Sequence, residues 1–170
     1  PGLAIVRRAI ERGLPVTCAP GPSAVLDALA LSGLPTDRFC YEGFVPRKHA
    51  ERMQRLRSLR AEQRTIVFYE TPHRIAETMP DLLGEFGPDR RMALCRELTK
   101  DYEQIRRGTI AQIKQSVDDD PPRGEIVLVI APPPDRPAEA PEDADALLLA
   151  ALETLKPSQA AAEVARATGL

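Results

Sequence analysis

Apolar residues follow helical and strand-like spacings in turn along most of the chain. Helical spacing over residues 3–12 predicts a first helix that Gly13 ends. A second helix is predicted over 23–33, with Ser23 as its N-cap. Between them, the apolar run at 15–18 predicts a short buried strand. Both helices precede a longer region in which strands and helices alternate.

Residues 36–131 carry five strand-like segments and three amphipathic ones, a pattern typical of a layered α/β domain. The segment at 65–69 is apolar at every position, which predicts that both of its faces are covered. Thr71 and Pro72 behind it predict the start of a helix, as cap and first-turn proline. The expected strands lie at 39–44, 65–69, 91–95, 102–106 and 124–130, and the expected helices at 50–59, 71–84 and 109–117.

A proline-rich acidic segment at 132–143 separates this region from the C-terminal end. Such a composition predicts a stiff, extended linker, and we expect Pro132 to Pro141 to be exposed and mobile. Two helices are predicted after it, at 144–155 and 158–167. The second one resembles the first helix of a helix-turn-helix whose partner is absent, and a plain helical hairpin is an equally open interpretation. The expected units are 1–35, 36–131, 132–143 and 144–170.

The composition excludes several classes of protein. The chain has 170 residues, 28% of them charged, and a net charge of -2, which excludes a uniformly basic nucleic-acid coat. No apolar run approaches the about 20 residues of a membrane span, and no secretory signal is visible at the N-terminus. Three scattered cysteines, Cys18, Cys40 and Cys95, suit a reduced cytoplasm and predict small buried side chains rather than a metal site.

Charge is concentrated between residues 47 and 64, where seven basic residues and two acidic ones give a local charge of +5. Such a run is either a solvated helix face or a surface that faces phosphates, and both interpretations stay open. Because only Glu51 and Glu62 accompany the cations, we expect the cations to be available to a partner.

Polar residues that are candidates for catalysis or ligand binding follow several predicted strands. The turn at Pro20 and Gly21 leads into a helix N-terminus, which favours an anion, although a structural turn explains it as well. Glu70 ends the strand at 65–69, where open α/β sheets bind ligands. Glu97 and Lys100 leave the next strand in the same way, as part of a site or as a simple ion pair. No Ser-His-Asp order suggests a hydrolase.

Several blocks, taken in order, resemble the bacterial small-subunit ribosomal RNA cytidine 2'-O-methyltransferases, within the tetrapyrrole methylase superfamily. The resemblance runs from the first residue to the C-terminus. Acidic residues at positions 70 and 125 distinguish the chain from the porphyrin-modifying relatives and favour the RNA branch. The blocks are Pro20-Gly21-Pro22-Ser23-Ala24, Leu34 to Phe39, Tyr41 to Phe44, Phe68-Tyr69-Glu70 with His73-Arg74, Arg96 to Lys100 with Glu103, and Gly124 to Leu128.

The resemblance implies two α/β domains that hold S-adenosylmethionine in the cleft between them, a five-stranded mixed sheet in the second domain, and a homodimer. It also implies that most of the first domain is missing here, so we expect this chain alone to be inactive and to bind the cofactor weakly. The residues implied at the cofactor are Pro20, Gly21, Ser23, Ala24, Tyr69, Glu70, Leu98 and Glu125.

The implied substrate is a cytidine ribose in small-subunit ribosomal RNA, in the cytoplasm. A ribose hydroxyl is a poor nucleophile that a nearby base or cation would assist, and Glu97, Lys100 and Glu70 are equally open candidates. RNA phosphates are expected at Arg47, Lys48, Arg52, Arg55 and Arg74. Two other functions stay open: a tetrapyrrole or precorrin C-methyltransferase, and a non-catalytic RNA- or protein-binding module.

Overall fold

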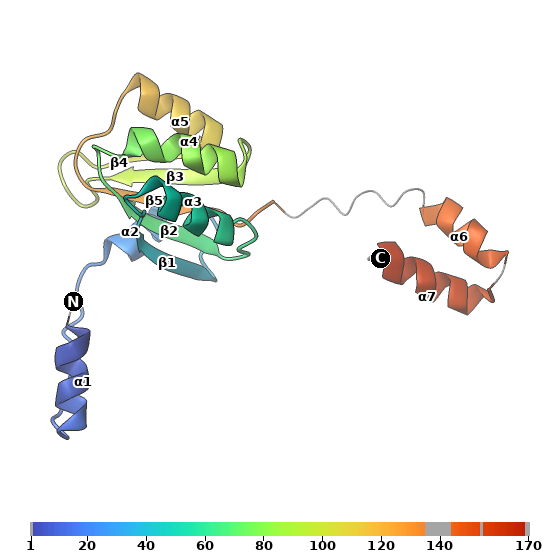
Figure 1. The fold of residues 1–170 in the computed structure, drawn as a ribbon, viewed down its shortest axis with the longest axis horizontal. Helices are drawn as coiled ribbons and strands as arrows, with labels where there is room; N and C mark the ends of the chain where they lie inside the picture. The colour runs from blue at the N-terminus through green and yellow to red at the C-terminus, as the bar shows by residue number, and fades with distance from the viewer. Residues whose placement is uncertain (1, 135–143, 154, 169–170) are drawn as a thin grey trace.

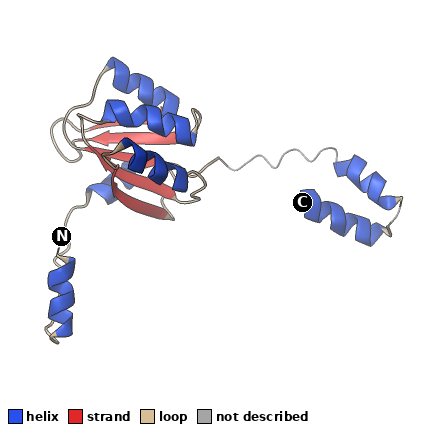
Figure 2. Cartoon of the chain, viewed as in Figure 1, coloured by secondary structure: helices blue, strands red, loops and turns tan. Residues whose placement is uncertain are grey.

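The computed structural model of the protein describes residues 2–134, 144–153 and 155–168. Figure 1 and Figure 2 show one sheet with helices on both of its faces. The strands are β1 (Phe39–Phe44), β2 (Thr65–Glu70), β3 (Arg91–Arg96), β4 (Gln104–Thr109) and β5 (Ile126–Ile130). The helices are α1 (Leu3–Glu11), α2 (Ala24–Ser32), α3 (His49–Ser58), α4 (Ile75–Phe86), α5 (Ile110–Asp119), α6 (Ala144–Leu152) and α7 (Pro157–Thr168).

The sheet is mixed and has the strand order β1-β2-β5-β3-β4. β1 and β2 are parallel, and each of the other neighbouring pairs is antiparallel. The five strands and the α/β layering confirm the predicted fold class. As a consequence of this topology, the C-terminal ends of β1, β2 and β3 lie at the same edge as the beginnings of β4 and β5.

Both faces of the sheet are covered, as the unbroken apolar run in β2 predicts. Ile66 and Phe68 point into a core that α3, α4 and α5 close, whereas Val67 between them faces α2. β3 alternates in the same way, with Met92 and Leu94 on one side and Cys95 on the other. This alternation follows from the two-residue period of a strand.

Helix ends follow the local sequence in most places. Thr109 caps α5 through a capping box, in which its hydroxyl accepts from the Gln112 N–H while the Gln112 side chain accepts from the Thr109 N–H. Gly33 ends α2 in the left-handed conformation with φ of 71°, which glycine adopts without strain. The predicted start at Thr71 and Pro72 is wrong, because a turn precedes α4, which begins only at Ile75.

Two further expectations near the N-terminus are wrong. Residues 15–18 form no strand and are exposed, since no neighbouring strand pairs with them in the described structure. Cys18 is therefore exposed, whereas Cys40 is half-buried and Cys95 is buried as expected. Burial raises the pKa of the Cys95 thiol to about 11, which is typical of an inert cysteine. The fourth strand also begins later than predicted, at Gln104.

Some of the expected units correspond to separate parts of the structure and others do not. Although we expect a boundary near residue 35, α2 packs on β3 and β5 and shares the core of the sheet. In the expected linker, Pro132 and Pro133 are half-buried, and residues 135–143 lie outside the described residues. The two predicted C-terminal helices are present as α6 and α7, which pack against each other.

Candidate functional site

The edge where β2 and β3 end gathers the polar segments singled out in the sequence. Glu70, Ile126, Arg96 and Gln104 stand in adjacent register across β2, β5, β3 and β4. The segments that carry Glu97, Lys100 and Glu125 are therefore neighbours, although they are far apart in the chain. This is the edge at which α/β sheets bind ligands.

A pocket of about 400 Å³ opens at this edge, over the ends of β1 and β2 and the beginning of β5. Its volume lies within the range of about 300–1,000 Å³ that small-molecule sites occupy. Ala24, Tyr69, Glu70 and Glu125, four of the residues expected at the cofactor, line it. The chain fold thus brings together residues from α2, β2 and the loop before β5.

The remaining expected cofactor residues lie elsewhere. Pro20 and Gly21 are exposed in the segment before α2, and Ser23 is the residue that precedes this helix. Leu98 is buried in the apolar cluster beneath α2. Sequence reasoning also missed six lining residues, which belong to strand ends and turns: Phe44, Thr71, Pro72, Gly124, Ile126 and Val127.

One wall of the pocket is aromatic. The ring of Tyr69 lies edge-on to those of Tyr41 and Phe44, with ring centroids 5.1 Å and 5.4 Å apart. Burial, followed by the neighbouring Tyr41, raises the pKa of the Tyr69 hydroxyl. Phe44 and Tyr41 stay exposed, so this wall offers flat apolar surface to a planar ligand.

Lys100 lies between two carboxylates beside the pocket. Its Nζ is 3.2 Å from Glu97 Oε1 and 3.0 Å from Glu125 Oε2. Glu97 Oε1 also accepts from the Glu125 backbone N–H at 2.8 Å, and the Glu97 N–H donates to the Glu125 carbonyl at 3.0 Å. Two of the three open catalytic candidates, Glu97 and Lys100, therefore form one network with Glu125.

This network fixes the charge state of its members. The bond from the Glu125 N–H and then the Lys100 ammonium lower the pKa of Glu97. The Glu125 and then the Glu97 carboxylate raise the pKa of Lys100. At neutral pH Lys100 is thus a cation, which suits electrostatic stabilisation of a developing oxyanion better than proton abstraction.

The backbone around this network is tightly fitted. Glu97 has φ of 48° and Thr99 has φ of 65°, in the region that non-glycine residues seldom adopt. Gly124 has φ of 86°, and a Cβ there would overlap the Glu97 carboxylate. The approach of Glu97 to the loop before β5 therefore requires glycine at position 124. Strain of this kind is characteristic of functional sites.

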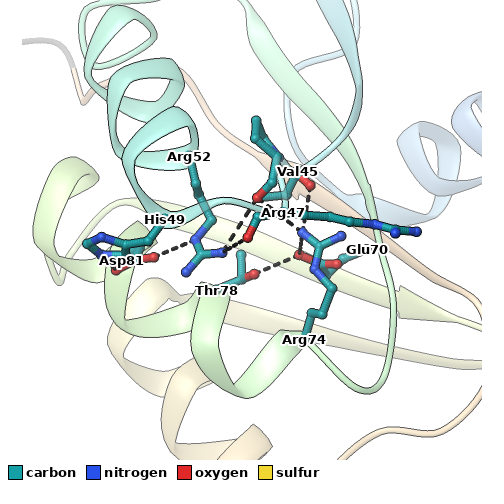
Figure 3. Close-up of polar contacts among 9 residues, drawn as sticks. Val45, Arg47, His49, Arg52, Glu70, Arg74, Thr78 and Asp81 are labelled. Atoms are coloured by element: carbon teal, nitrogen blue, oxygen red, sulfur yellow. Dashed lines mark hydrogen bonds and ion pairs between the residues drawn. The ribbon is translucent and has the colours of Figure 1, made fainter.

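Glu70, the third catalytic candidate, does not share this position. Its side chain is fully buried, and its carboxylate accepts from the Thr71 N–H at 2.8 Å and from Thr78 Oγ1 at 2.6 Å. Arg74 lies 3.4 Å from it and also donates to the Val45 carbonyl, as Figure 3 shows. With its oxygens hydrogen-bonded inside the protein, Glu70 joins β2 to α4, and its side chain is not exposed at the pocket.

The expected RNA surface on α3 also needs correction. The expectation that its cations lack acidic partners is wrong, because Glu42, Asp81 and Glu85 reach them from other elements. Arg52 is only 4% exposed, donates to Asp81 Oδ2 at 2.5 Å and to two backbone carbonyls, and holds α3 to α4 (Figure 3). Arg55 pairs with Glu42.

Three of the expected RNA contacts remain exposed, namely Arg47, Lys48 and Arg55, the last of which pairs with Glu42. Lys48 keeps 80% of its side chain exposed although it contacts Glu51. Arg47 is exposed, and no ion pair or hydrogen bond occupies its side chain in the part of the chain that is described. Arg74 is mostly buried against Glu70 and the carbonyls of Val45 and Pro46. Phosphate contact therefore stays a prediction for Arg47, Lys48 and Arg55 and conflicts with the burial of Arg52 and Arg74.

Among the described residues, no three or more His, Cys, Asp and Glu side chains form a group suited to a metal ion. The described helices also include none with the length and apolar character that a bilayer span requires.

Comparison with known proteins relates this geometry to a family. Residues 1–114 match the profile of the tetrapyrrole (corrin/porphyrin) methylases, and residues 138–170 match that of the RsmI C-terminal HTH domain. The sequence is 46% identical over 97% of its length to the ribosomal RNA small subunit methyltransferase I of Erythrobacter litoralis. It is 41% identical over 99% of its length to the enzyme of the same name from Mesorhizobium japonicum.

The chain spans 58% of the length of each of these two relatives. Among solved structures, the methyltransferase CobJ superposes on 76% of this chain and 58% of its own, with a TM-score of 0.55 at 19% identity. That likeness concerns the fold. The profile match covers the chain from α1 through β4, including the pocket residues from α2, β1 and β2, and this chain belongs to the tetrapyrrole (corrin/porphyrin) methylase family.

Proposed function

We propose that the protein is an S-adenosylmethionine-dependent methyltransferase that methylates the ribose 2'-hydroxyl of a cytidine in small-subunit ribosomal RNA. The observation that carries this proposal is the 46% identity, over 97% of the chain, to a relative named ribosomal RNA small subunit methyltransferase I. That match includes the sheet edge and continues through α6 and α7. The protein would act in the cytoplasm, where ribosomal subunits are assembled, and as a homodimer.

The residues at the sheet edge fit the cofactor. S-Adenosylmethionine combines a planar adenine, ribose hydroxyls, a sulfonium and an amino acid group. The pocket offers aromatic surface from Tyr69 and Phe44 and the exposed carboxylate of Glu125, which suit an adenine and a hydroxyl or cationic group. When bound, the cofactor supplies a methyl group carried on a positively charged sulfur.

The network around Lys100 supplies the groups that a ribose hydroxyl needs. The hydroxyl must lose its proton as its oxygen takes the methyl group, and a carboxylate can accept that proton directly. Glu97 and Glu125 are the carboxylates at this edge, and Glu125, with 84% of its side chain exposed, is the more accessible. Lys100 remains protonated and stabilises the oxygen as negative charge develops.

The test is methyl transfer by the full-length protein to small-subunit particles that lack the modification. We expect labelled methyl groups in the ribosomal RNA and a 2'-O-methyl that blocks alkaline cleavage after a cytidine. Lys100→Gln should lower turnover by about 100-fold, the size of effect typical of a lost electrostatic group. Lys114→Gln is the matched control, because Lys114 pairs with Asp118 on the surface of α5, and its turnover should equal the parent's.

Two other results would contradict this proposal. Methyl transfer to a tetrapyrrole with none to the particle would overturn the proposal and favour the C-methyltransferase alternative. RNA binding without transfer of any methyl group would leave only the non-catalytic binding module.

A further inference from the structure

A second hollow lies beside the pocket, at the same edge of the sheet. It has a volume of about 660 Å³, and Arg96, His73 and Arg123 are among the residues that line it. Pro72 lines both this hollow and the first pocket. A further depression of about 390 Å³ shares Arg96 and Arg123 with it and reaches Glu97. Arg96 therefore lies between the candidate catalytic network and an open basic hollow.

One donor of Arg96, its Nε, is buried and has no hydrogen-bond partner in the described structure. The two fully buried arginines differ from the half-buried Arg96: Arg52 donates to Asp81, and Arg90 donates to the carbonyls of Ala131, Arg60 and Glu62. Burying a charged donor without an acceptor is costly, and native proteins seldom leave one so. Arg96 also lines the open hollow, and its side chain makes no hydrogen bond or ion pair within the described residues, so its guanidinium is available to a ligand bound there.

The acidic residues near Arg96 are already engaged. Asp120, which lines the hollow, accepts from Arg106 Nη2 at 2.5 Å. Glu97 is held by Lys100 and by the Glu125 N–H. Arg123 and His73 carry no ion pair or hydrogen bond on their side chains in the described structure. Arg96 and Arg123 thus line the hollow without an ion pair in the described structure.

We propose that Arg96, with Arg123 and His73 beside it, binds a phosphate of the RNA backbone adjacent to the nucleotide that is methylated. This inference rests on the proposed function. An arginine fork matches two oxygens of a phosphodiester, and the open hollow admits a strand that continues past the site. The hollow adjoins the aromatic pocket at Pro72 and shares Arg96 and Arg123 with the depression that reaches Glu97, so a phosphate held there lies close to the network.

The experiment uses the full-length enzyme and a single-stranded RNA that contains the target cytidine. Arg96→Gln and Arg123→Gln are compared with the parent and with Arg91→Gln, an exposed arginine at the opposite end of β3. We expect the RNA affinity of each test variant to fall about tenfold, the usual size for a lost charged contact. The slope of log affinity against log salt should shrink by about 0.7 for each contact. Arg91→Gln should match the parent.

A modified substrate localises the contact. Replacing one phosphate next to the target with an uncharged methylphosphonate should weaken binding by the parent more than binding by Arg96→Gln, because the variant has already lost one of the contacts to that phosphate. Arg96→Lys keeps the charge without the fork and should recover part of the affinity. Because Arg96 Nε makes no hydrogen bond in the protein, thermal unfolding of Arg96→Gln should match that of the parent.

Three outcomes would overturn the inference. Salt slopes equal to the parent's in both test variants would show that no phosphate is bound. Weaker cofactor binding by Arg96→Gln with unchanged RNA binding would assign the arginine to the cofactor carboxylate. Equal loss for every methylphosphonate position would mean a diffuse charge effect. If the parent itself transfers no methyl group to RNA, the proposed function fails, whereas methylation by the parent with any of these outcomes defeats only the phosphate site.

Discussion

The α3–α4 interface and the edge of the sheet are built from the same charged residue types, yet the two regions use them differently. In the interface Arg52 meets Asp81, and next to it, where β2 leads into α4, Arg74 meets Glu70, so that each buried charge has a partner. At the edge, Arg96 has a buried donor without a partner. Paired charges hold elements together, whereas an unpaired charge beside a hollow is available to a ligand.

The comparison predicts opposite behaviour on substitution. Changes in the interface should lower stability and leave turnover of the folded enzyme intact. Changes at the edge should lower turnover or RNA affinity with a smaller effect on stability.

The largest effect is expected from Arg52→Ala. It leaves Asp81, which is only 14% exposed, without its cation, and breaking a buried pair in this way should lower the free energy of unfolding by about 3 kcal/mol. Denaturant titration of the full-length enzyme measures this loss. The control is Arg47→Ala, which is exposed and makes no pair in the described structure, and its unfolding should match the parent's. Equal stability of the two variants would contradict the structural role of Arg52.

Glu70→Gln separates a structural carboxylate from a catalytic one. The amide cannot accept from Thr78, Arg74 and the Thr71 N–H together, so we expect about 2 kcal/mol less stability. Turnover, measured below the unfolding transition, should stay close to the parent's. A lost turnover with unchanged unfolding would return Glu70 to the catalytic candidates.

Gly124→Ala tests whether turnover depends on the close approach of Glu97 to the loop before β5. The added methyl would overlap Glu97, and φ of 86° disfavours alanine, so stability should fall by about 1 kcal/mol and turnover should fall more strongly. Gly84→Ala is the matched control, because Gly84 lies inside α4 with open space around its Cα. That change should raise stability by about 0.5–1 kcal/mol. Turnover of Gly124→Ala equal to the parent's would mean that the position of Glu97 is irrelevant to the chemistry.

The sequence predicts the elements of this fold better than the partners of its charges. Apolar periodicity predicts the strands β1, β2 and β3, and Thr109 predicts the cap of α5. Both predictions succeed because they depend only on residues that lie close together in the chain. The partners of the α3 arginines lie 13 to 29 positions away in the chain. A count of charge within the helix cannot include them, so the predicted basic surface was too large.

The candidate site was predictable in part for the same reason. Residues that follow strands, such as Glu97 and Lys100, were found because strand ends share an edge in an α/β sheet. That Glu125 joins them depends on β5 lying between β2 and β3, which no local pattern reveals. Likewise, nothing local distinguishes Glu70 from Glu97, since each follows an apolar strand. Only the packing of α4 against β2 buries one of the two carboxylates.

The smallest expected effect concerns the protonation of the Lys100 network. The pKa of Glu97 lies below its ordinary value of 4.5, so its contribution to stability is present above that pH and is lost as pH falls through the lowered pKa. The pKa of Lys100 lies above 10.5, so its contribution is present below that pH and is lost as pH rises through the raised pKa. Lys100→Gln should move the pKa of Glu97 upward but not to its ordinary value, because the Glu125 N–H, which has the larger influence, still donates to it. Carboxyl carbon NMR of the full-length enzyme, with Lys114→Gln as control, measures this shift. An unmoved Glu97 resonance in Lys100→Gln would mean that the ammonium and the carboxylate do not interact in solution, and Lys100 would then be free to act on a ligand without its neighbours.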